Sequence, residues 1–254
     1  MAPPNMAQFR LPSTDALHGR AFELTFEDGA ALSLIFNADK TVQWAARDVA
    51  WSGEGRDHCD VVEVATGVWF VDIDLNLPAL DAVTVVLNEV TGWALVIHQH
   101  REPTEEHAYG PAVQHSFYPA SIGGLAQIGK APHETRELLG RWHLYRYSPE
   151  NLYEHIYLSS TKMCSHNLKT QNTQGRADCH DTSYYKVSDF LYVITWREHY
   201  SQAAMVFAEN LATLTTTGKV LHPVSPDRSV SVPIGGVVMP AEVQFPAIET
   251  YDRP

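Results

Sequence analysis

The sequence predicts an all-β protein made of two related antiparallel domains, each a small barrel or a strongly curved sheet. Three observations predict this class. Short segments with two-residue alternation recur at regular spacing, helical periodicity is scarce, and the pattern of the first half returns in the second. The 254 residues, 44% of them hydrophobic, are enough for two domains with cores of their own.

The repeat is clearest in residues 19–40 and 140–160, which a shift of 121 residues superposes as two hairpins. Successive side chains of a strand point to opposite faces, so alternate residues line one surface. In the first copy this surface consists of Phe22, Leu24, Phe26, Leu32, Leu34 and Phe36, and in the second of His143, Tyr145, Tyr147, Tyr153, His155 and Tyr157. An interior position in both copies predicts a packed first domain and a polar-lined cavity in the second. An inverted second copy, or tyrosines that pack and reach water at their tips, is the alternative.

The first half divides into an arm, a domain and a connection. Residues 1–17, rich in Pro and Ala, are expected to form a loose arm. Residues 18–100 form the first β-barrel domain, with a packed core and strands expected at 20–27, 31–37, 41–47, 59–65, 68–75, 82–90 and 93–100. Asp28-Gly29 is a hairpin signal between the first two. Residues 101–138 break the alternation and are interpreted as a connecting segment, in which 132–139 suit a short helical turn.

The second half repeats this order over residues 139–222, the second β-barrel domain. Strands are expected at 141–147, 152–159, 162–169, 178–187, 190–200, 202–210 and 212–222. A shift of 122 matches 190–196 with 68–74, and 203–209 loosely match 81–87. Residues 223–254 form a Pro-rich tail with a Gly235-Gly236 joint and room for one or two short strands, such as 230–232 and 241–245.

Net charge is −12, which argues against nucleic acid and anionic membranes as partners. Residues 1–127 carry −11 of this charge and residues 128–254 only −1. No apolar run suggests a signal peptide or a membrane span. Three cysteines, Cys59, Cys164 and Cys179, lack metal-site spacing and are odd in number, which favours reduced thiols and a cytoplasmic protein. A homodimer is left open.

Three short motifs resemble the molybdenum cofactor biosynthesis protein F (MoaF-like) family: 148–150 (SPE), 153–157 (YEHIY) and 196–198 (WRE). Residues 19–36 are similar to the N-terminal domain of that family and 139–222 to its C-terminal domain. The resemblance implies two calycin-like (lipocalin-like) β-barrels, an architecture that holds hydrophobic or aromatic ligands. Some similar barrels catalyse decarboxylation, isomerisation, dehydration or ring closure without a cofactor. The family name comes from gene context, and we infer neither molybdenum nor a chemical step from it.

Candidate catalytic residues lie on the polar face of the second hairpin. His143 and His155 occupy equivalent inward positions, and a histidine gives or takes protons near neutral pH. Tyr145 and Tyr157 can donate hydrogen bonds to an oxygen where negative charge develops. The candidates for binding the substrate are Tyr147, Tyr153, Tyr184, Trp196, Arg197, Glu198, Met205 and Phe207.

The strand at 190–200 can be placed with either face inward. One choice puts Tyr192, Ile194 and Trp196 inside, and the other puts Thr195, Arg197 and His199 there. The large apolar indole of Trp196 favours the first choice. In the second, Arg197 would suit a carboxylate ligand.

Two further histidine patterns are weak signals. His98-Gln99-His100 on a strand places both imidazoles on one side, as in some zinc sites, with His58 or His107 as a third ligand. A zinc site needs three or four converging ligands, so no metal or cofactor is predicted. In 179–181 (CHD) the neighbouring thiol and imidazole face opposite ways on a strand, which argues against a cysteine nucleophile.

The sequence has no dinucleotide, phosphate-loop, hydrolase or zinc-protease motif. We therefore expect a cofactor-independent enzyme whose second barrel binds a small aromatic, polyketide- or terpenoid-like molecule. Dehydration, isomerisation or cyclisation, possibly pericyclic, would use His/Tyr acid–base chemistry. The alternatives are a carrier for a hydrophobic metabolite and a structural protein that docks through its acidic first barrel.

Overall fold

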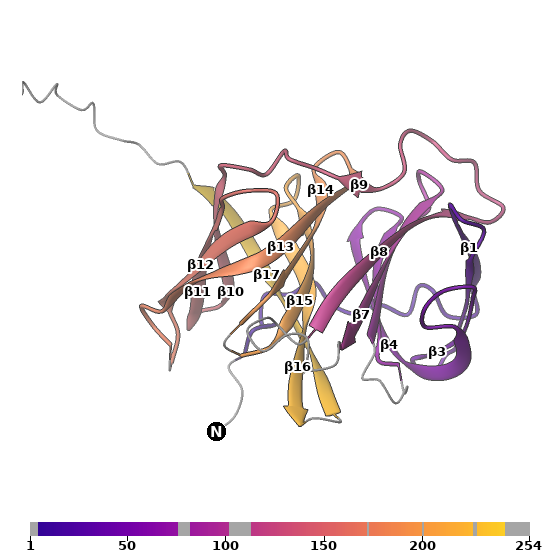
Figure 1. The fold of residues 1–254 in the computed structure, drawn as a ribbon, viewed down its shortest axis with the longest axis horizontal. Helices are drawn as coiled ribbons and strands as arrows, with labels where there is room; N and C mark the ends of the chain where they lie inside the picture. The colour runs from indigo at the N-terminus through magenta and orange to yellow at the C-terminus, as the bar shows by residue number, and fades with distance from the viewer. Residues whose placement is uncertain are drawn as a thin grey trace, which may run out of the picture.

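The structure, a computed structural model, describes residues 5–75, 82–101, 113–171, 173–199, 201–225 and 228–241. These residues form strands and no helix, and none of them therefore belongs to a helix that could cross a membrane. Figure 1 shows two barrels side by side, the first in indigo to magenta and the second in orange to yellow. The predicted all-β fold of two tandem barrels is confirmed.

The first barrel is a closed meander in which each strand pairs with the next and β8 pairs back with β1. Its strands are β1 (Ala21–Phe26), β2 (Ala31–Phe36), β3 (Thr41–Arg47), β4 (Gly53–Ala65), β5 (Val68–Ile73), β6 (Ala82–Asn88), β7 (Trp93–Arg101) and β8 (Val113–Ile122). Closure by β8 leaves neither β1 nor β7 as a free sheet edge.

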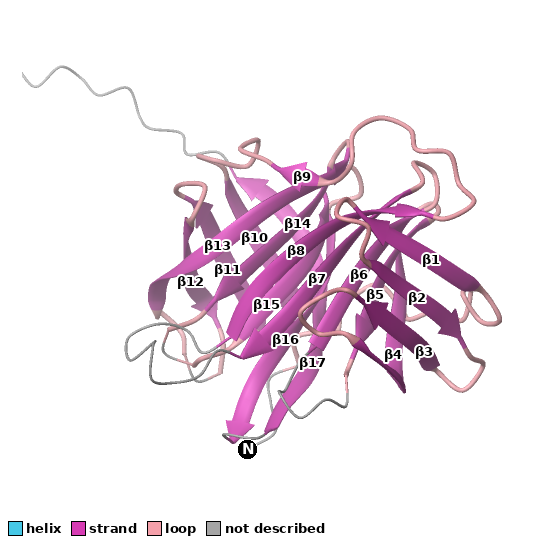
Figure 2. Cartoon of the chain, turned by 45° about the vertical axis from the view of Figure 1, so that its right-hand side comes forward, coloured by secondary structure: helices cyan, strands magenta, loops and turns pink. Residues whose placement is uncertain are grey.

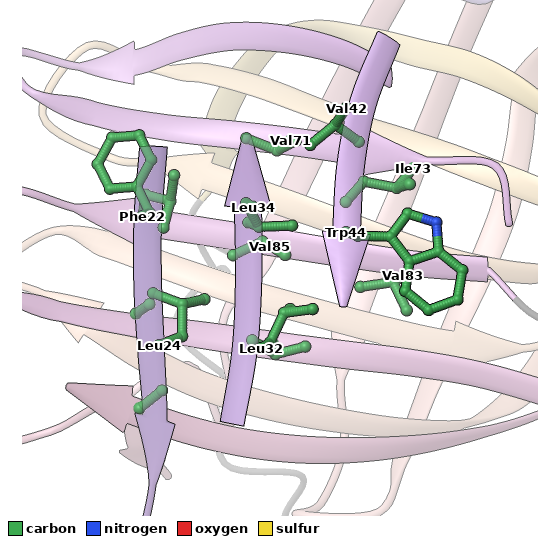
Figure 3. Packing of buried hydrophobic residues seen from close by; sticks show 14 of the residues in the cluster. Phe22, Leu24, Leu32, Leu34, Val42, Trp44, Val71, Ile73, Val83 and Val85 are labelled. Atoms are coloured by element: carbon green, nitrogen blue, oxygen red, sulfur yellow. The ribbon is translucent and has the colours of Figure 1, made fainter. Parts of the chain in front are cut away.

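Alternation of apolar residues explains how this barrel fills. Side chains of β1 alternate between exposed and buried, and the buried set joins that of β2, β3, β5 and β6 in one apolar cluster. Figure 3 shows Leu24 and Leu34 directed toward Val71 and Val85 on the opposite wall. Hydrocarbon from facing strands thus meets at the barrel axis.

The second barrel repeats the meander. Its strands are β10 (Trp142–Ser148), β11 (Asn151–Tyr157), β12 (Lys162–Lys169), β13 (Ala177–Ser188), β14 (Leu191–Arg197), β15 (Ala204–Asn210), β16 (Thr215–Ser225) and β17 (Arg228–Ala241). β17 pairs with β10, and β12 with β13, so the ring closes. The short β9 (His133–Glu134) adds to the end of β13, where a helical turn at 132–139 had been predicted to start.

The domain boundaries differ from the predicted ones because the last strand of each barrel was missed. Residues 113–122, predicted as connection, form β8 and close the first barrel. Residues 228–241, predicted as tail, form β17 and close the second. β8 shows little alternation because most of its side chains are half-buried. The predicted strand at 241–245 reaches outside the described residues.

β17 was not predicted because it contains prolines. Its pairing with the neighbouring strands explains why prolines are tolerated there. Pro233 pairs only with β16, since β10 joins β17 from Val237 onward. Pro240 pairs only with β10, because the pairing of β17 with β16 ends at Val237. A proline without an N–H is tolerated where a strand has one free side. At Gly236, a Cβ atom would lie 2.1 Å from the Arg146 carbonyl oxygen, so the strands meet at a distance that only glycine allows.

The predicted loose arm is packed in its described part. The Phe9 amide donates to the Tyr147 carbonyl at 3.1 Å, on the second barrel. Ser13 then forms a β-bridge with Val62 of the first barrel, and Leu17 is fully buried in the first core. Residues 5–17 therefore tie the two barrels together.

The barrels also contact each other directly. An apolar cluster joins the outer face of the first barrel to that of the second through residues such as Phe70, Leu95, Val193 and Val206. β8 lies beside β14 in this interface (Figure 2). Fully buried Lys219 of the second barrel forms an ion pair with Asp72 of the first.

The predicted alignment of the two barrels, with a shift of 122 residues, is wrong by one residue at β5 and β14. The core of the first barrel takes Val71 and Ile73 from β5, and that of the second takes Ile194 and Trp196 from β14. These positions align with a shift of 123, one residue more than predicted. A slip of one residue moves a whole strand to its other face, so the predicted alignment would have turned Trp196 outward.

Candidate functional site

The polar face of the second hairpin points into the second barrel. His143 pairs directly with His155, and Tyr145 with Tyr153, across β10 and β11. Both histidines are almost fully buried. The inverted arrangement is thus excluded, and the polar residues occupy the positions at which the first barrel has its hydrocarbon core.

The deep part of this interior is a closed polar cluster around Glu209 of β15. Tyr145 donates a hydrogen bond to Glu209 Oε2 and contacts the hydroxyl of Tyr157, which lies 3.4 Å from the same oxygen. The Nδ1 atom of His143 lies 2.9 Å from Glu209 Oε1, although the two are not oriented for a hydrogen bond. Burial and the Glu209 carboxyl group raise the pKa of Tyr145 and Tyr157 well above the usual range. We call His143, Tyr145, Tyr157 and Glu209 the Glu209 cluster.

Beside this cluster lies a cavity of about 500 Å³, large enough for a small organic molecule. One part of its wall is apolar or aromatic: Met6, Tyr147, Tyr153, Trp196, Ala203, Met205, Val220, Val232, Pro233 and Ile234. The other part is polar: His155, Ser165, Asn167, Thr173, Arg176, Asp178, His180, Glu198, Ser201 and His222. The apolar part can hold a ring, and the polar part can orient it.

His155 lies where the cavity meets the Glu209 cluster. Its ring centroid is 4.3 Å from that of Tyr145 and 5.0 Å from that of Trp196, whose indole meets it edge to face. Burial, with smaller effects of His180 and His143, lowers the pKa of His155 to about 3. Within the described part of the chain, neither ring nitrogen has a hydrogen-bond partner. His155 is therefore a neutral imidazole that a ligand can hydrogen-bond.

The hairpin of β12 and β13 supplies much of the polar wall. Ser165 Oγ lies 2.8 Å from His180 Nε2, and His180 is almost fully buried. Burial lowers the pKa of His180, while Glu198 and Asp178 act in the opposite direction. Arg176 Nη2 lies 3.7 Å from Asp178 Oδ2. The side chains on this hairpin alternate, so His180 points inward and the neighbouring Cys179 outward.

The cysteine prediction is wrong for two of the three residues. Cys164 and Cys179 face each other across β12 and β13 and form a disulfide, while Cys59 is free and buried. Their pairing depends on the strand register, which cysteine spacing does not reveal. The cysteines therefore no longer support the cytoplasmic prediction.

The predicted site residues fall into three places. The cavity wall contains Tyr147, Tyr153, His155, Trp196, Glu198 and Met205. His143, Tyr145 and Tyr157 lie in the Glu209 cluster, and Phe207 stacks on Trp196 from behind the cavity wall. Two predicted residues are elsewhere. Arg197 lies 3.9 Å from Asp181 on the outer side of β14, and Tyr184 lines a smaller polar cavity with Thr135 and Arg136.

Sequence analysis missed His180, Ser165 and Glu209. The inward alternation of His180 and Tyr184 on β13 is a signal in the sequence, although the prediction treats His180 only as a neighbour of Cys179. Glu209 gave no such signal, because both faces of β15 are buried and its pattern shows no period.

The His-x-His pattern does not assemble a metal site in the described structure. The rings of His98 and His100 stack with centroids 5.0 Å apart. Among the residues that the structure describes, no group of three or more His, Cys, Asp or Glu side chains could hold a metal ion. The suggested ligand His107 lies outside the described residues.

Two tandem eight-stranded barrels, one packed and one with a lined cavity, define a calycin-like protein whose second barrel holds the candidate site. The chain matches the MoaF N-terminal domain over residues 2–100 and the MoaF C-terminal domain over residues 132–242. It therefore belongs to the MoaF family.

Two known proteins are similar to parts of this chain. "Protein MoaF" of Klebsiella aerogenes is 34% identical over 96 residues, which are 38% of this chain and 36% of that protein. The chain thus aligns with little more than a third of its relative. A crystal structure of a "putative beta-lactamase" from Burkholderia vietnamiensis is similar over 43% of this chain and 100% of that chain, with 15% identity and a TM-score of 0.36.

Proposed function

We propose that the second barrel binds a small aromatic, polyketide- or terpenoid-like molecule and catalyses a lyase- or isomerase-type step on it without a cofactor. One observation carries this proposal. His155 is a buried neutral imidazole in the wall of the cavity, next to Trp196, and it has no hydrogen-bond partner in the described part of the chain. A ligand in the cavity can supply the hydrogen bond that this ring lacks.

The cavity wall suits a flat ring. Tyr147, Tyr153 and Trp196 present aromatic surface on its apolar part, and Met205 adds a flexible side chain. Aromatic faces bind ring systems by offset or edge-to-face contact. A bound ring would displace water from the imidazole of His155 and place its substituents against the polar wall.

Proton transfer by His155 completes the proposed chemistry. The neutral ring accepts a proton from a carbon or hydroxyl of the substrate. Returning that proton to a different atom completes an isomerisation or a cyclisation. In a dehydration, the proton leaves with the departing hydroxide as water. The phenol of Tyr153, whose pKa burial and Glu198 raise to about 12, stays protonated and can donate to a developing oxyanion.

The Glu209 cluster acts in this proposal as a positioning element. Glu209 fixes the hydroxyl of Tyr145, and the ring of Tyr145 packs on His155. His143, Tyr145 and Tyr157 thus hold the imidazole in place and do not contact the substrate. This assignment replaces the catalytic roles that the sequence suggested for these three residues.

A carrier for a hydrophobic metabolite is the second candidate, and one observation favours it. The buried carboxyl group that could activate a histidine, Glu209, lies against His143 and not against His155. Without such a partner His155 would select a ligand by hydrogen bonding and leave it unchanged.

Hydrogen exchange on a model ketone separates the two candidates. β-Tetralone is a small bicyclic ketone whose α-protons exchange when a base enolises it, and NMR in deuterium oxide follows the loss of its α-proton signal. The enzyme proposal expects exchange at least about a hundredfold above buffer, the usual scale of general base catalysis. His155→Ala should abolish this excess and still bind the ketone. His166→Ala, on the outward side of β12 beside Glu154, should match the wild type.

Each result of the exchange experiment with β-tetralone supports a different conclusion. Binding without excess exchange would identify a carrier. Excess exchange that survives in His155→Ala would overturn the assigned base, and absence of binding would contradict both functions.

A further inference from the structure

The carboxylate of Glu198 has an unusual position in the cavity wall. Glu198 directly follows β14, and its amide donates to the Ala203 carbonyl at 2.8 Å, which extends the pairing of β14 with β15. Side-chain alternation places Glu198 on the same inward side as Trp196. Ser201 donates a hydrogen bond to Glu198 Oε2. The carboxylate is therefore held in place and half-buried.

The charges of the described residues in the cavity wall do not balance. Its described lining includes one guanidinium, of Arg176, and two carboxylates, of Asp178 and Glu198. Arg176 lies 3.7 Å from Asp178 and so offsets that charge. His180 is no substitute, because burial lowers its pKa and keeps the ring neutral near pH 7. Among the described residues, Glu198 forms no ion pair.

Aromatic side chains share the cavity wall with this carboxylate. The charge of Glu198 contributes to the raised pKa of Tyr153, which places the phenol within its field. Tyr147 packs against Tyr153 with ring centroids 5.5 Å apart, and Trp196 lies two residues before Glu198. A carboxylate beside aromatic faces is the combination that attracts an ammonium group, through charge–charge and cation–π contacts.

We propose that the ligand of the second barrel carries a protonated amine, which binds Glu198 while its apolar ring lies against Trp196 and Tyr153. This inference rests on the proposed small-molecule site and adds the chemical class of the ligand. The ammonium group supplies the positive charge that Glu198 lacks among the described residues of the wall, and Ser201 keeps the carboxylate directed to receive it. A carboxylic acid would meet like charge at the same place.

Three probes of nearly equal shape test the inference: naphthylethylamine, ethylnaphthalene and naphthylpropionate. Isothermal titration with the full-length protein measures each dissociation constant. We expect the amine to bind at least about tenfold more tightly than the neutral arene, the scale of a charged hydrogen bond, and the acid to bind most weakly. In Glu198→Gln, the amine should lose that advantage and the neutral arene should bind as in the wild type.

Glu154→Gln is the matched control, because Glu154 pairs with His166 on the outside of the same barrel. It should leave all three affinities unchanged. Equal binding of amine and neutral arene to the wild type would overturn the inference and leave the proposed function standing. Equal weakening of both probes by Glu198→Gln would also overturn it. If no arene binds, the proposed function itself fails.

Discussion

The two barrels share a meander of eight strands and differ in what fills it. At equivalent positions of the first hairpin, the first barrel has Leu34 and the second His155. On the opposite wall, Leu87 of β6 corresponds to Glu209 of β15, since both precede a buried asparagine at the end of their strand. A polar group on one wall is thus matched by a polar group on the other. The comparison shows that a repeated scaffold can have a packed core in one copy and a polar-lined cavity in the other when facing positions differ together.

The replacement of apolar by polar side chains at equivalent positions also explains why only the second barrel has the cavity described above. The apolar side chains of the first barrel interdigitate around Leu24, Leu34 and Val85, and such cores approach crystal density. The polar side chains of the second barrel are held by directional contacts with Glu209. Groups fixed in this way cannot collapse to fill the space beside them, so the volume next to His155 stays open.

The largest expected loss of stability comes from placing the counterpart of Glu209 in the first barrel. Leu87→Glu would bury a carboxylate among hydrocarbon without the tyrosines that Glu209 has. We expect it to cost roughly 4 kcal/mol or more, enough to unfold a domain of ordinary stability. Urea denaturation followed by tryptophan fluorescence measures this loss, with Leu87→Met as the volume-matched control. A loss below about 1 kcal/mol would mean that the first barrel is not tightly packed.

A smaller effect compares truncations at equivalent positions. Leu34→Ala removes a fully buried side chain from a packed core and should cost about 3 kcal/mol. His155→Ala enlarges an existing cavity and breaks no hydrogen bond among described residues, so we expect about 1 kcal/mol or less. The same urea titrations test both variants. Equal losses would show that His155 is a packed core residue and would remove the basis of the candidate site.

The sequence was informative where one side of a strand differs from the other. Alternation in 143–157 predicted the inward face of β10 and β11, and the bulk of Trp196 favoured the correct face of β14. Alternation is lost where both faces are buried. β15 packs against the first barrel on one side and the cavity on the other, so Glu209 is not distinguishable from its neighbours by period.

Other features depend on partners that are distant in sequence. β8 and β17 close their barrels with side chains that face the other barrel or with prolines on a free side, and neither resembles an alternating strand. The disulfide required the register of β12 with β13. The cavity required the arm to bring Met6 onto the second barrel, where its carbonyl accepts from Gly235 at 3.0 Å.

The last comparison follows a buried histidine and a half-buried one by their response to acid. Burial lowers the pKa of His155, in the cavity, and of His115, on β8 at the interface, to about 3 in each case. Between about pH 6.5 and 3 the unfolded chain binds a proton on each ring that the folded chain does not. Each ring therefore removes stability as pH falls, by about 1.4 kcal/mol per pH unit.

Replacing either ring should flatten this dependence by that amount. Urea denaturation at pH steps from 7 to 4, with wild type, His155→Gln and His115→Gln, measures the slope. His166→Gln is the control, because its ring is partly exposed on the outside of the barrel. A slope unchanged in His155→Gln but reduced in His115→Gln would mean that the His155 ring takes up its proton in the folded protein. The cavity would then hold a hydrated cation in place of a neutral base, and the proton transfer assigned to His155 would have to start from the charged ring.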